Sequence, residues 1–388
     1  MSEIKNIDEL VNNLTSDLIS IPGEQSEALL GGIISFELQL PFNYKIGNVL
    51  YSKVVSFFEC HFYSPVKLIN IPQNIYFEDC VFYSKVDAFN GIFDGKVRFK
   101  NCEFRGKTIF LNAKFNNLAD FYNSTFYQPT TFYKTDFNDT AVFTSVRFKE
   151  NVLFTYSLFA GKSIFARTKF EKGFDFSQSI IAGQLQLFDL DIDFKGYMAE
   201  YVGNDDQQFQ DNVHFLHKIP LINKVTTFQI LKNQFAKQGN HIDEITMRQQ
   251  EKKAFLELTL ERKKDKNWTK STRVDQFILW LNRWSNNYRS DFRNGISFTV
   301  IVAAGFLLLT FLTTGEFWNR LCLSCEFDLT VIGYSIKQFI NFLNPAHNIS
   351  YIDSLKPLFG IPYIIDFLGR IAVGYGYYQT VQAFRKFR

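Results

Sequence analysis

Large apolar residues recur in the first half of the chain at a spacing that fits neither an α-helix nor a simple strand. From Phe77, alternate steps of five and six residues reach nineteen positions as far as Phe176, and all but Ala88 are phenylalanine. An α-helix repeats every 3.6 residues and a strand every two. A chain that turns a corner after each five or six residues would point all of these side chains into one core.

The pattern predicts a coil with four sides and about 22 residues, because two sides of five and two of six alternate. The residue two places before each phenylalanine is usually small, whereas the residue directly before it is unrestricted. Coils stacked at the strand spacing of about 4.8 Å would align the rings in columns, as in a solenoid. The regular part of the ladder comprises Phe99, Phe104, Phe110, Phe115, Phe121, Phe126, Phe132, Phe137, Phe143, Phe148, Phe154, Phe159, Phe165, Phe170 and Phe176.

The five-residue unit, with a small residue at its start and phenylalanine at its centre, resembles the pentapeptide-repeat proteins. The resemblance covers roughly residues 57–192 and implies a right-handed quadrilateral β-helix, a β-solenoid with about 22 residues per coil. A sixth residue in every second unit departs from the strict repeat. We expect this extra residue at alternate corners, as a bulge.

The balanced charge of the predicted solenoid limits the classes of partner that it can bind. Residues 57–194 hold 15 basic and 15 acidic side chains, within a chain whose net charge is +3. A protein that imitates DNA needs a dense negative field, and a nucleic-acid binder needs a positive one. We therefore expect no nucleic-acid partner, and topoisomerase inhibition by DNA mimicry is the least favoured function.

The five cysteines do not form a disulfide framework, since they are odd in number and mostly far apart. Cys60, Cys80 and Cys102 occupy the small inward position of the ladder, where packing is the expected role. For Cys322 and Cys325, a disulfide, a redox pair and free thiols all stay open. No phosphate loop, GxSxG or HExxH motif is present, so we expect no enzyme, no metal and no cofactor.

The chain is expected to divide into an N-terminal cap at 1–56, the solenoid at 57–194, a linker, helical hairpin and amphipathic helix at 195–294, and a membrane module at 295–388. In the amphipathic helix, Trp280, Trp284 and Tyr288 recur at helical spacing among arginines. Tryptophan and tyrosine beside basic residues suit the headgroup zone of a membrane. We therefore predict an interfacial helix anchored by these three side chains, rather than an amphipathic helix in water.

Two segments near the C-terminus are long enough to cross a membrane. Residues 296–315 carry no charge over twenty positions, which spans about 30 Å, the thickness of the hydrocarbon core. Residues 362–384 are predicted to cross back. Basic residues precede the first segment and follow the second, so the positive-inside rule places both ends in the cytoplasm. The prediction is a multi-pass protein of the inner (cell) membrane, with its solenoid and C-terminus cytoplasmic.

The pentapeptide AVGYG at residues 372–376 differs by one letter from the TVGYG of potassium-channel filters. A filter is an extended loop that precedes a full inner helix, and only twelve residues follow Gly376. We therefore exclude a filter. Gly369, Ala372 and Gly376 are predicted instead to form a small-residue face at which helices approach closely.

Polar residues inside the second segment are the candidate site. Asp366 and Arg370 lie four apart on one helical face and can pair, and Gln379 and Gln382 extend the polarity. Charged residues in a membrane span usually face a bundle interior or water. Two interpretations stay open: a water-facing lining in a homo-oligomer, and a structural ion pair at the outer interface or in a helix that never crosses.

The ending IIDFLGRIAVGYGYYQTVQAFRKF, with LNRWSNN before the first segment, resembles uncharacterised bacterial membrane proteins that fuse pentapeptide repeats to a two-pass module. Such modules are similar in layout to simple ion channels. Our first hypothesis is a homo-oligomer in the lipid bilayer whose cytoplasmic solenoid senses or binds an unknown protein or small molecule and whose helices form a pore. The layout of a sensor joined to a membrane module is the sole ground for a hypothetical role in stress or phage defence. The alternative is a non-conducting scaffold anchored in the membrane.

Overall fold

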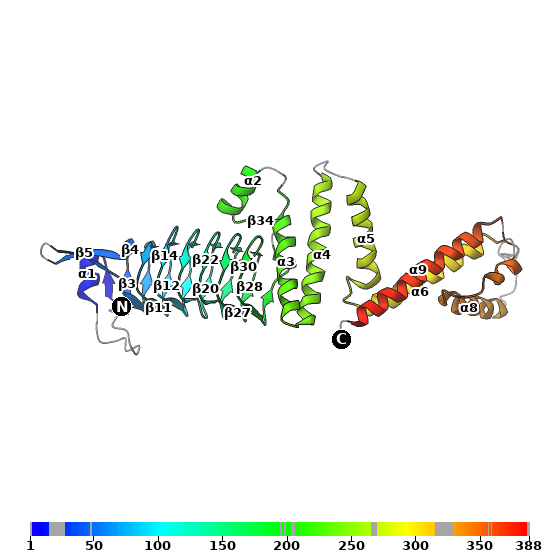
Figure 1. The fold of residues 1–388 in the computed structure, drawn as a ribbon, viewed down its shortest axis with the longest axis horizontal. Helices are drawn as coiled ribbons and strands as arrows, with labels where there is room; N and C mark the ends of the chain where they lie inside the picture. The colour runs from blue at the N-terminus through cyan, green and yellow to red at the C-terminus, as the bar shows by residue number, and fades with distance from the viewer. Residues whose placement is uncertain are drawn as a thin grey trace. The chain divides into compact units, whose positions relative to one another are not determined.

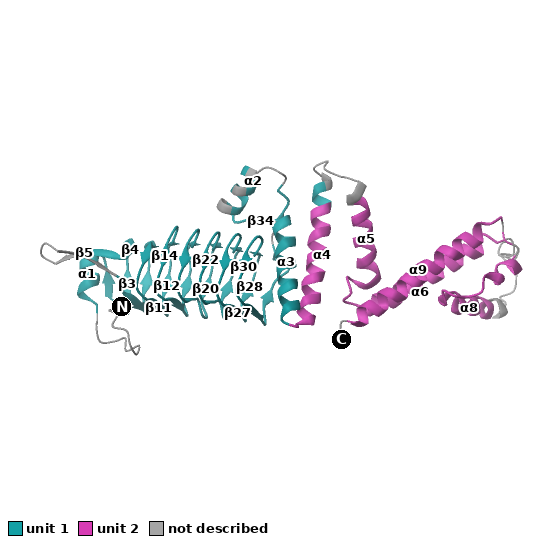
Figure 2. Cartoon of the chain, viewed as in Figure 1, with its two compact units in different colours: residues 1–238, 260–265 teal, residues 239–259, 266–388 magenta. Residues whose placement is uncertain are grey.

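The computed structural model describes residues 2–14, 28–46, 49–194, 196–197, 199–202, 206–264, 270–314, 329–355, 357 and 359–385. The chain divides into two compact units, residues 1–238 with 260–265 and residues 239–259 with 266–388 (Figure 2). The first unit holds a β-solenoid, and the second consists of helices (Figure 1).

Four parallel sheets run along the solenoid, one for each side of the coil. Strands pair with the strand one coil later, as Phe77 does with Phe99. The first sheet contains β1 (Ser2–Ile4), β3 (Gly32–Ile34), β8 (His61–Phe62), β12 (Val81–Phe82), β16 (Glu103–Phe104), β20 (Thr125–Phe126), β24 (Arg147–Phe148), β28 (Lys169–Phe170) and β32 (Asp191–Ile192). The second contains β2 (Ala28–Leu30), β7 (Ser56–Phe58), β11 (Ile75–Glu78), β15 (Val97–Lys100), β19 (Ala119–Asp120), β23 (Ala141–Val142), β27 (Ser163–Ala166) and β31 (Leu185–Phe188).

The third sheet contains β10 (Asn70–Ile71), β14 (Ile92–Phe93), β18 (Lys114–Phe115), β22 (Asp136–Phe137), β26 (Leu158–Phe159) and β30 (Ile180–Ile181). The fourth contains β4 (Leu38–Leu40), β9 (Val66–Leu68), β13 (Val86–Asp87), β17 (Thr108–Ile109), β21 (Thr130–Thr131), β25 (Val152–Leu153) and β29 (Phe174–Asp175). The predicted four-sided β-solenoid is confirmed, with about 6 coils of roughly 22 residues.

The phenylalanine rings form four continuous columns inside the coil. Along a column the rings stack nearly parallel, with 5.5 Å between the centroids of Phe99 and Phe121 and 4.4 Å between Phe104 and Phe126. Rings of adjacent columns meet edge to face, as Phe121 and Phe132 do at 5.5 Å and 79°. Both arrangements suit the charge distribution of an aromatic ring. Each phenylalanine of the ladder is 1% exposed or less, so these rings are the core.

The small residues of the ladder join successive coils. Ser124 Oγ donates a hydrogen bond to the Phe99 carbonyl at 2.8 Å, and Ser157 Oγ donates to the Phe132 carbonyl at 2.6 Å. Both serine side chains are fully buried, and a buried hydroxyl requires a partner. A small residue therefore does two things here: it leaves room for the neighbouring ring, and its hydroxyl ties one coil to the one before.

The corners alternate between two conformations. Each five-residue side carries one residue with a left-handed backbone, at φ between 50° and 59°. These residues recur at intervals of 11: Asp79, Asn90, Asn101, Asn112, Asn123, Lys134, Ser145, Tyr156, Arg167, Gln178 and Asp189. Asparagine tolerates this conformation better than most residues. We expected two kinds of corner to alternate, and they do. The left-handed residue, however, lies in the five-residue sides, whereas the extra residue lies in the six-residue sides.

The solenoid begins before residue 57, the predicted boundary. Residues 28–40 already form three sides of a coil, because β2 pairs with β7, β3 with β8 and β4 with β9. An antiparallel hairpin of β5 (Phe42–Ile46) and β6 (Val49–Lys53) follows, and helix α1 (Ile7–Asn12) precedes this coil. The phenylalanine pattern does not extend here because the buried positions are aliphatic: Leu29, Ile34 and Leu38.

Helix α3 (Leu221–Lys237) covers the last coils and corrects the predicted linker. Asn223 Nδ2, Thr227 Oγ1 and Thr155 Oγ1 donate to the carboxylate of Asp175 at 2.8, 3.3 and 2.8 Å. Burial raises the pKa of this carboxyl group. Residues 195–238 therefore belong with the solenoid as its cap. The remaining elements of this cap are β33 (Ala199–Glu200), α2 (Asp206–Gln210), the π-helix η1 (Asp211–Phe215) and β34 (Ile219–Pro220).

The second unit contains a long antiparallel helix pair. Its elements are most of α4 (His241–Lys264), α5 (Lys270–Asn286), α6 (Phe292–Leu312), α8 (Leu329–Leu343), the 3-10 turns η2 (Ile349–Tyr351) and η3 (Asp353–Leu355), and α9 (Ile361–Phe384). The rings of Phe292 and Phe384 lie 4.8 Å apart at one end of the α6–α9 pair, and Thr314 bridges to Pro357 at the other. Residues 372–376 lie inside α9, so the filter-like pentapeptide is helical, as expected.

Replacing Phe132 by alanine is expected to destabilise the solenoid by about 3–5 kcal/mol, since it removes a fully buried ring from the middle of a column. Thermal unfolding followed by circular dichroism in the β-sheet region measures this change. Phe89, at 53% exposed, gives the matched control, and Phe89→Ala should change the stability by less than about 0.5 kcal/mol. Equal effects of the two substitutions would contradict the assigned core.

Candidate functional site

Small residues lie where α9 meets its neighbours. Gly369 and Gly376 are buried, and Ala372 is half-buried. A Cβ atom at Gly376 would overlap the side chain of Thr299 in α6, and one at Gly369 would overlap the ring of Phe342 in α8. The absence of a side chain lets the helix backbones approach closely. The two glycines therefore lie in helix contacts, whereas Ala372 lies at the edge of them.

The outward face of the α6–α9 pair is apolar, and its inside combines polar side chains with apolar ones such as Ala303, Leu307 and Val373. Apolar side chains point outward and are 42–62% exposed: Val300, Ile301, Leu308, Leu309, Ile364, Phe367, Leu368, Ile371 and Val381. Polar side chains lie inside and are at most 6% exposed: Thr299, Thr310, Asp366 and Gln379. Continuous apolar surface of this extent is rare on proteins in water. Inward polar groups and outward aliphatic ones are typical of helices in lipid.

Helix α6 is the one helix of the described residues that is long and apolar enough to cross a membrane. Its most apolar stretch has a mean hydropathy of 2.3. Helix α9 is longer, at 24 residues, but Asp366, Arg370 and two glutamines lower its hydropathy. The crossing predicted for residues 362–384 therefore stays a prediction.

Asp366 is fully buried and accepts hydrogen bonds from three parts of the chain. Arg370 Nε, one turn later in α9, donates to Oδ2 at 2.7 Å. His347 Nε2 and the Tyr351 hydroxyl each lie 2.8 Å from Oδ1. The pairing expected between Asp366 and Arg370 is present in the structure. The loop after α8 completes the shell around the carboxylate.

His347 lies between a backbone carbonyl and the carboxylate of Asp366. Its Nδ1 is 2.7 Å from the carbonyl oxygen of Asn344, which can only accept a hydrogen bond. Its Nε2 faces the carboxylate of Asp366 at 2.8 Å. Burial raises the pKa of the Tyr351 phenol, which therefore remains a donor. The aspartate thus lies between the imidazole ring of His347 and the guanidinium of Arg370.

Gln379 and Gln382 do not join this cluster. About 20 Å of helix separates Asp366 from Gln379. Gln379 is buried against α5. Its backbone carbonyl oxygen accepts from Asn286 Nδ2 at 3.3 Å, and its side-chain amide donates to Asn282 Oδ1 at 3.4 Å. Gln382 is half-buried. The four predicted lining residues therefore form two separate polar groups at opposite ends of α9.

The partners of these side chains were missed in the sequence. His347 and Tyr351 lie in NPAHNISY, and Asn282 and Asn286 lie in LNRWSNN. Two polar side chains beside a proline in an apolar region were a signal of a buried polar cluster. Their partner could not be read from spacing, because Asp366 lies 19 residues from His347 in another element.

The two tryptophans and Tyr288, grouped in the sequence, have different environments. Trp280 and Trp284 are 52% and 42% exposed on one face of α5, with 5.5 Å between their rings. Tyr288 is only 4% exposed, in the turn that follows the end of α5 at Asn286. Because the helix ends first, helical spacing does not apply to Tyr288. Its predicted role as an interfacial anchor beside the tryptophans is therefore corrected.

The solenoid cysteines are free and buried, as the packing role requires. Burial raises the pKa of the Cys80 thiol, and the contact with Cys80, followed by burial, raises the pKa of Cys60. Thiols of this kind stay protonated and unreactive. The described residues contain no cluster of three or more potential metal ligands. Cys322 and Cys325 lie outside the described residues.

One column on the solenoid surface alternates aromatic and basic side chains. Tyr63 and Tyr83 stack at 4.4 Å, and the Arg105 guanidinium lies 5.0 Å from the Tyr83 ring and 5.9 Å from that of Tyr127. The Lys149 ammonium lies 4.5 Å from the Tyr127 ring. Each residue follows a strand of the first sheet, so the column crosses five coils. We call these five residues the tyrosine–cation stripe.

Comparison with known families agrees with this geometry. The family model described as Pentapeptide repeats (9 copies) matches residues 92–136. These residues are pentapeptide repeats. The match lies in the middle of the solenoid, where the phenylalanine ladder is uninterrupted. Searches of the curated proteins and of the solved structures gave no significant match.

Replacing Gly376 by leucine is expected to destabilise the α6–α9 pair by about 1–3 kcal/mol, since the new side chain overlaps Thr299. Thermal stability of the purified protein in detergent measures this effect. Gly374 provides the matched control, because a Cβ atom there has nothing within 4 Å. If Gly374→Leu is equally damaging, the close contact at Gly376 does not exist.

Replacing Asp366 by alanine is expected to destabilise the same unit by about 3–5 kcal/mol, because Arg370 and His347 lose their shared acceptor in an apolar setting. Asp353→Ala removes an exposed carboxylate nearby and serves as control in the same melting experiment. Adding Arg370→Met to Asp366→Ala should recover part of the loss. An Asp366→Ala protein as stable as the control would show that the cluster carries no stability.

Proposed function

We propose that this protein is a membrane-anchored interaction protein, in which the α6–α9 pair spans the bilayer and the pentapeptide-repeat solenoid binds a partner. The polarity of the helix pair carries the proposal. In hydrocarbon, outward leucine and isoleucine are favourable, whereas an outward aspartate costs several kcal/mol. The observed arrangement, with Asp366 fully buried and Leu308 53% exposed, has the lower free energy in lipid.

Basic residues support an orientation with both ends in the cytoplasm. Arg289 and Arg293 lie at the start of α6, and Arg385 follows α9. The start of α6 and the end of α9 lie side by side, as the contact of Phe292 with Phe384 indicates. The positive-inside rule then assigns this end to the cytoplasmic side of the cell membrane. The solenoid precedes the same end in the chain and is cytoplasmic in this orientation.

Two helices suit the membrane surfaces. The exposed tryptophans of α5 suit the headgroup level on the cytoplasmic side. Helix α8 carries Ile332, Ile336 and Ile340 at four-residue intervals, and they are 40%, 54% and 61% exposed. A single apolar stripe of this kind is typical of a helix that lies in the interface. The proposed module therefore consists of two crossings with an interfacial helix at each surface.

The solenoid supplies the interaction surface. Successive coils are tied by backbone pairing and buried hydroxyl groups, so its surface side chains are held in fixed rows. The tyrosine–cation stripe is such a row, with flat aromatic faces held beside cations. Rigid aromatic side chains lose little conformational entropy on binding. The proposed partner is a cytoplasmic protein or small molecule.

The geometry favours an anchor over a pore. Asp366 and Gln379 find hydrogen-bond partners within one chain, so neither requires a water-filled lumen. One observation keeps an oligomeric pore as the second candidate. Arg370 Nη2 is buried and has no acceptor among the described residues. A neighbouring subunit in a homo-oligomer would supply that acceptor.

The full chain is expected in the membrane fraction that resists carbonate extraction. The pair Ile301→Asp and Leu308→Asp, on the outward face of α6, should release most of the protein, because each charge costs about 2.5–3.5 kcal/mol in the bilayer centre. The pair Ile180→Asp and Leu30→Asp is the matched control. It places the same two charges at solenoid positions that are 62% and 50% exposed, and this variant should stay with the membranes.

Wild-type protein in the extractable fraction would rule out the anchor. Planar-bilayer recordings then separate the two candidates for a protein that does fractionate with membranes. An anchor gives no conductance, whereas unitary currents of the wild-type protein would favour the oligomeric pore.

A further inference from the structure

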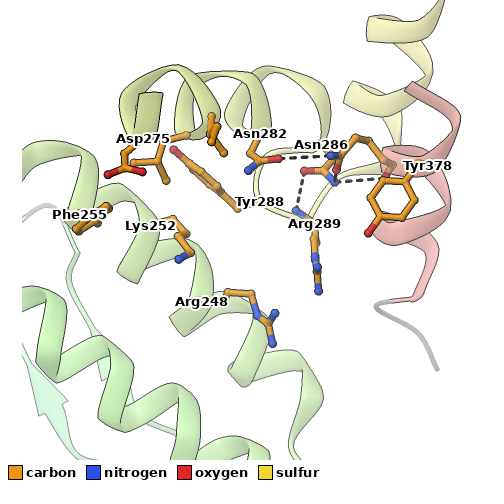
Figure 3. A pocket seen from close by; sticks show the side chains of 12 residues that line it. Arg248, Lys252, Phe255, Asp275, Asn282, Asn286, Tyr288, Arg289 and Tyr378 are labelled. Atoms are coloured by element: carbon orange, nitrogen blue, oxygen red, sulfur yellow. Dashed lines mark hydrogen bonds between the residues drawn. The ribbon is translucent and has the colours of Figure 1, made fainter. Parts of the chain in front are cut away.

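A cavity of about 440 Å³ lies within the helical unit, among α4, α5, the turn after α5, and α9 (Figure 3). Three of its lining side chains are basic, Arg248 and Lys252 from α4 and Arg289 from the turn, and one is acidic, Asp275. Sites for small ligands have volumes of roughly 300–1,000 Å³. The cavity is therefore large enough for a ligand, and its excess of positive charge favours an anion.

The basic groups are available to such a ligand. In the described part of the chain, no carboxylate lies within 4.0 Å of the Lys252 ammonium or of the Arg289 guanidinium. Arg248 is paired with Glu244 through Nη2, but its buried Nε has no acceptor there either. Isolated cations that share one cavity repel each other, and an anion between them removes that repulsion.

Tyr288 provides a second, independent sign of a missing ligand. Its side chain is 4% exposed, and its hydroxyl has no hydrogen-bond partner among the described residues. Burial raises the pKa of this phenol, so it remains a donor. A buried donor without an acceptor costs about 1–3 kcal/mol. Figure 3 shows the Tyr288 ring among the side chains that line the cavity, with its hydroxyl on the side of Asp275 and away from Arg289.

The turn that carries Tyr288 and Arg289 is strained. Asn287, Tyr288 and Arg289 have φ angles of 48°, 59° and 73°, so three successive non-glycine residues are left-handed. Each such residue costs roughly 1–2 kcal/mol. The turn is held by Asn286 Oδ1, which accepts from the Arg289 backbone N–H at 2.9 Å. Strain of this kind is typical of binding sites, and here it brings both side chains to the cavity.

The position of the cavity favours a lipid as the source of the anion. Tyr378 lines the cavity and is also 55% exposed on the outward face of α9, one turn before Val381, which is 53% exposed. The polar cavity is therefore continuous with the apolar surface of the helix pair. A headgroup inside the cavity would leave its acyl chains along α9.

We propose that this cavity binds the phosphate of an anionic phospholipid headgroup. Lys252 and Arg289 neutralise the phosphate, and the Tyr288 hydroxyl donates to another oxygen of the headgroup. Arginine matches the geometry of phosphate oxygens, and basic pockets at the cytoplasmic ends of membrane helices suit such headgroups. This inference rests on the proposed membrane anchor. A free phosphate ester offers the same chemistry, so the experiment must separate the two sources.

The test uses the full chain in detergent micelles, titrated with phosphatidylglycerol, phosphatidylcholine or glycerol 1-phosphate. Native mass spectrometry counts retained lipid, and thermal shifts give the affinity. Wild type should retain phosphatidylglycerol in preference to phosphatidylcholine. The pair Lys252→Gln and Arg289→Gln should weaken this binding by about tenfold or more, since both charge-assisted contacts are lost.

A matched pair controls for charge. Lys253→Gln and Arg385→Gln remove the same two charges from α4 and from the residue after α9, but neither residue lines the cavity. This pair should bind phosphatidylglycerol as wild type does. Equal weakening in both pairs would show non-specific attraction and overturn the site.

Tyr288→Phe tests the site in a second way, in case the charge variants fail to fold. It removes only the hydroxyl group without a partner, so the lipid-free protein should be at least as stable as wild type. Its affinity for phosphatidylglycerol should nevertheless fall severalfold. Unchanged affinity, or a loss of stability without lipid, would remove Tyr288 from the site.

Three further outcomes separate the lipid site from the membrane anchor. Glycerol 1-phosphate that displaces phosphatidylglycerol with equal affinity would assign the cavity to a free phosphate ester and overturn the lipid. If the protein resists carbonate extraction but shows no preference for phosphatidylglycerol, the lipid site is contradicted and the membrane anchor is not. If the protein is absent from the membrane fraction, both the anchor and the lipid site are contradicted.

Discussion

Hydrogen bonding between the backbones of successive coils sets their spacing, and this spacing decides which side chains fit the interior. Parallel strands about 4.8 Å apart bring equivalent positions of neighbouring coils into contact. Each inward position must therefore hold a residue that packs on its own copy. Flat phenylalanine rings do so, with separations from 4.4 Å at Phe104 and Phe126 to 5.5 Å at Phe148 and Phe170. One residue type consequently fills the core, and the outward positions are free to vary.

The same backbone pairing leaves open strands at each end of the solenoid, which must be covered to prevent pairing with other chains. At the C-terminal end, α3 covers the last coils, and the buried carboxylate of Asp175 accepts hydrogen bonds from Asn223 and Thr227 of that helix. A buried acid at this point fixes the helix in one position, since any other position would leave the carboxylate without donors. The cap is thus specified by polar contacts and the coils by apolar stacking.

The α6–α9 pair of the helical unit differs from the solenoid, because its outward face is apolar and polar groups lie among the apolar residues inside it. Two polar groups lie at opposite ends of the α6–α9 pair. At one end Asp366 is enclosed by His347, Tyr351 and Arg370, and its hydrogen bonds are made within the chain. At the other end, among the residues that the structure describes, the Lys252 ammonium has no carboxylate within 4.0 Å and the Tyr288 hydroxyl has no acceptor. The first group holds the helices together, and the second has the features of a binding site.

The sequence by itself determined the coil, because a corner every five or six residues leaves a local period that survives in the order of the phenylalanines. It also determined which residues form α6 and α9, since helix length and apolar content are local properties of the chain. Only the tertiary structure decided that residues 28–40 join the first coil, that Tyr288 turns inward and that His347 reaches Asp366. Each of these depends on where the chain returns after a turn, and no spacing along the sequence records that.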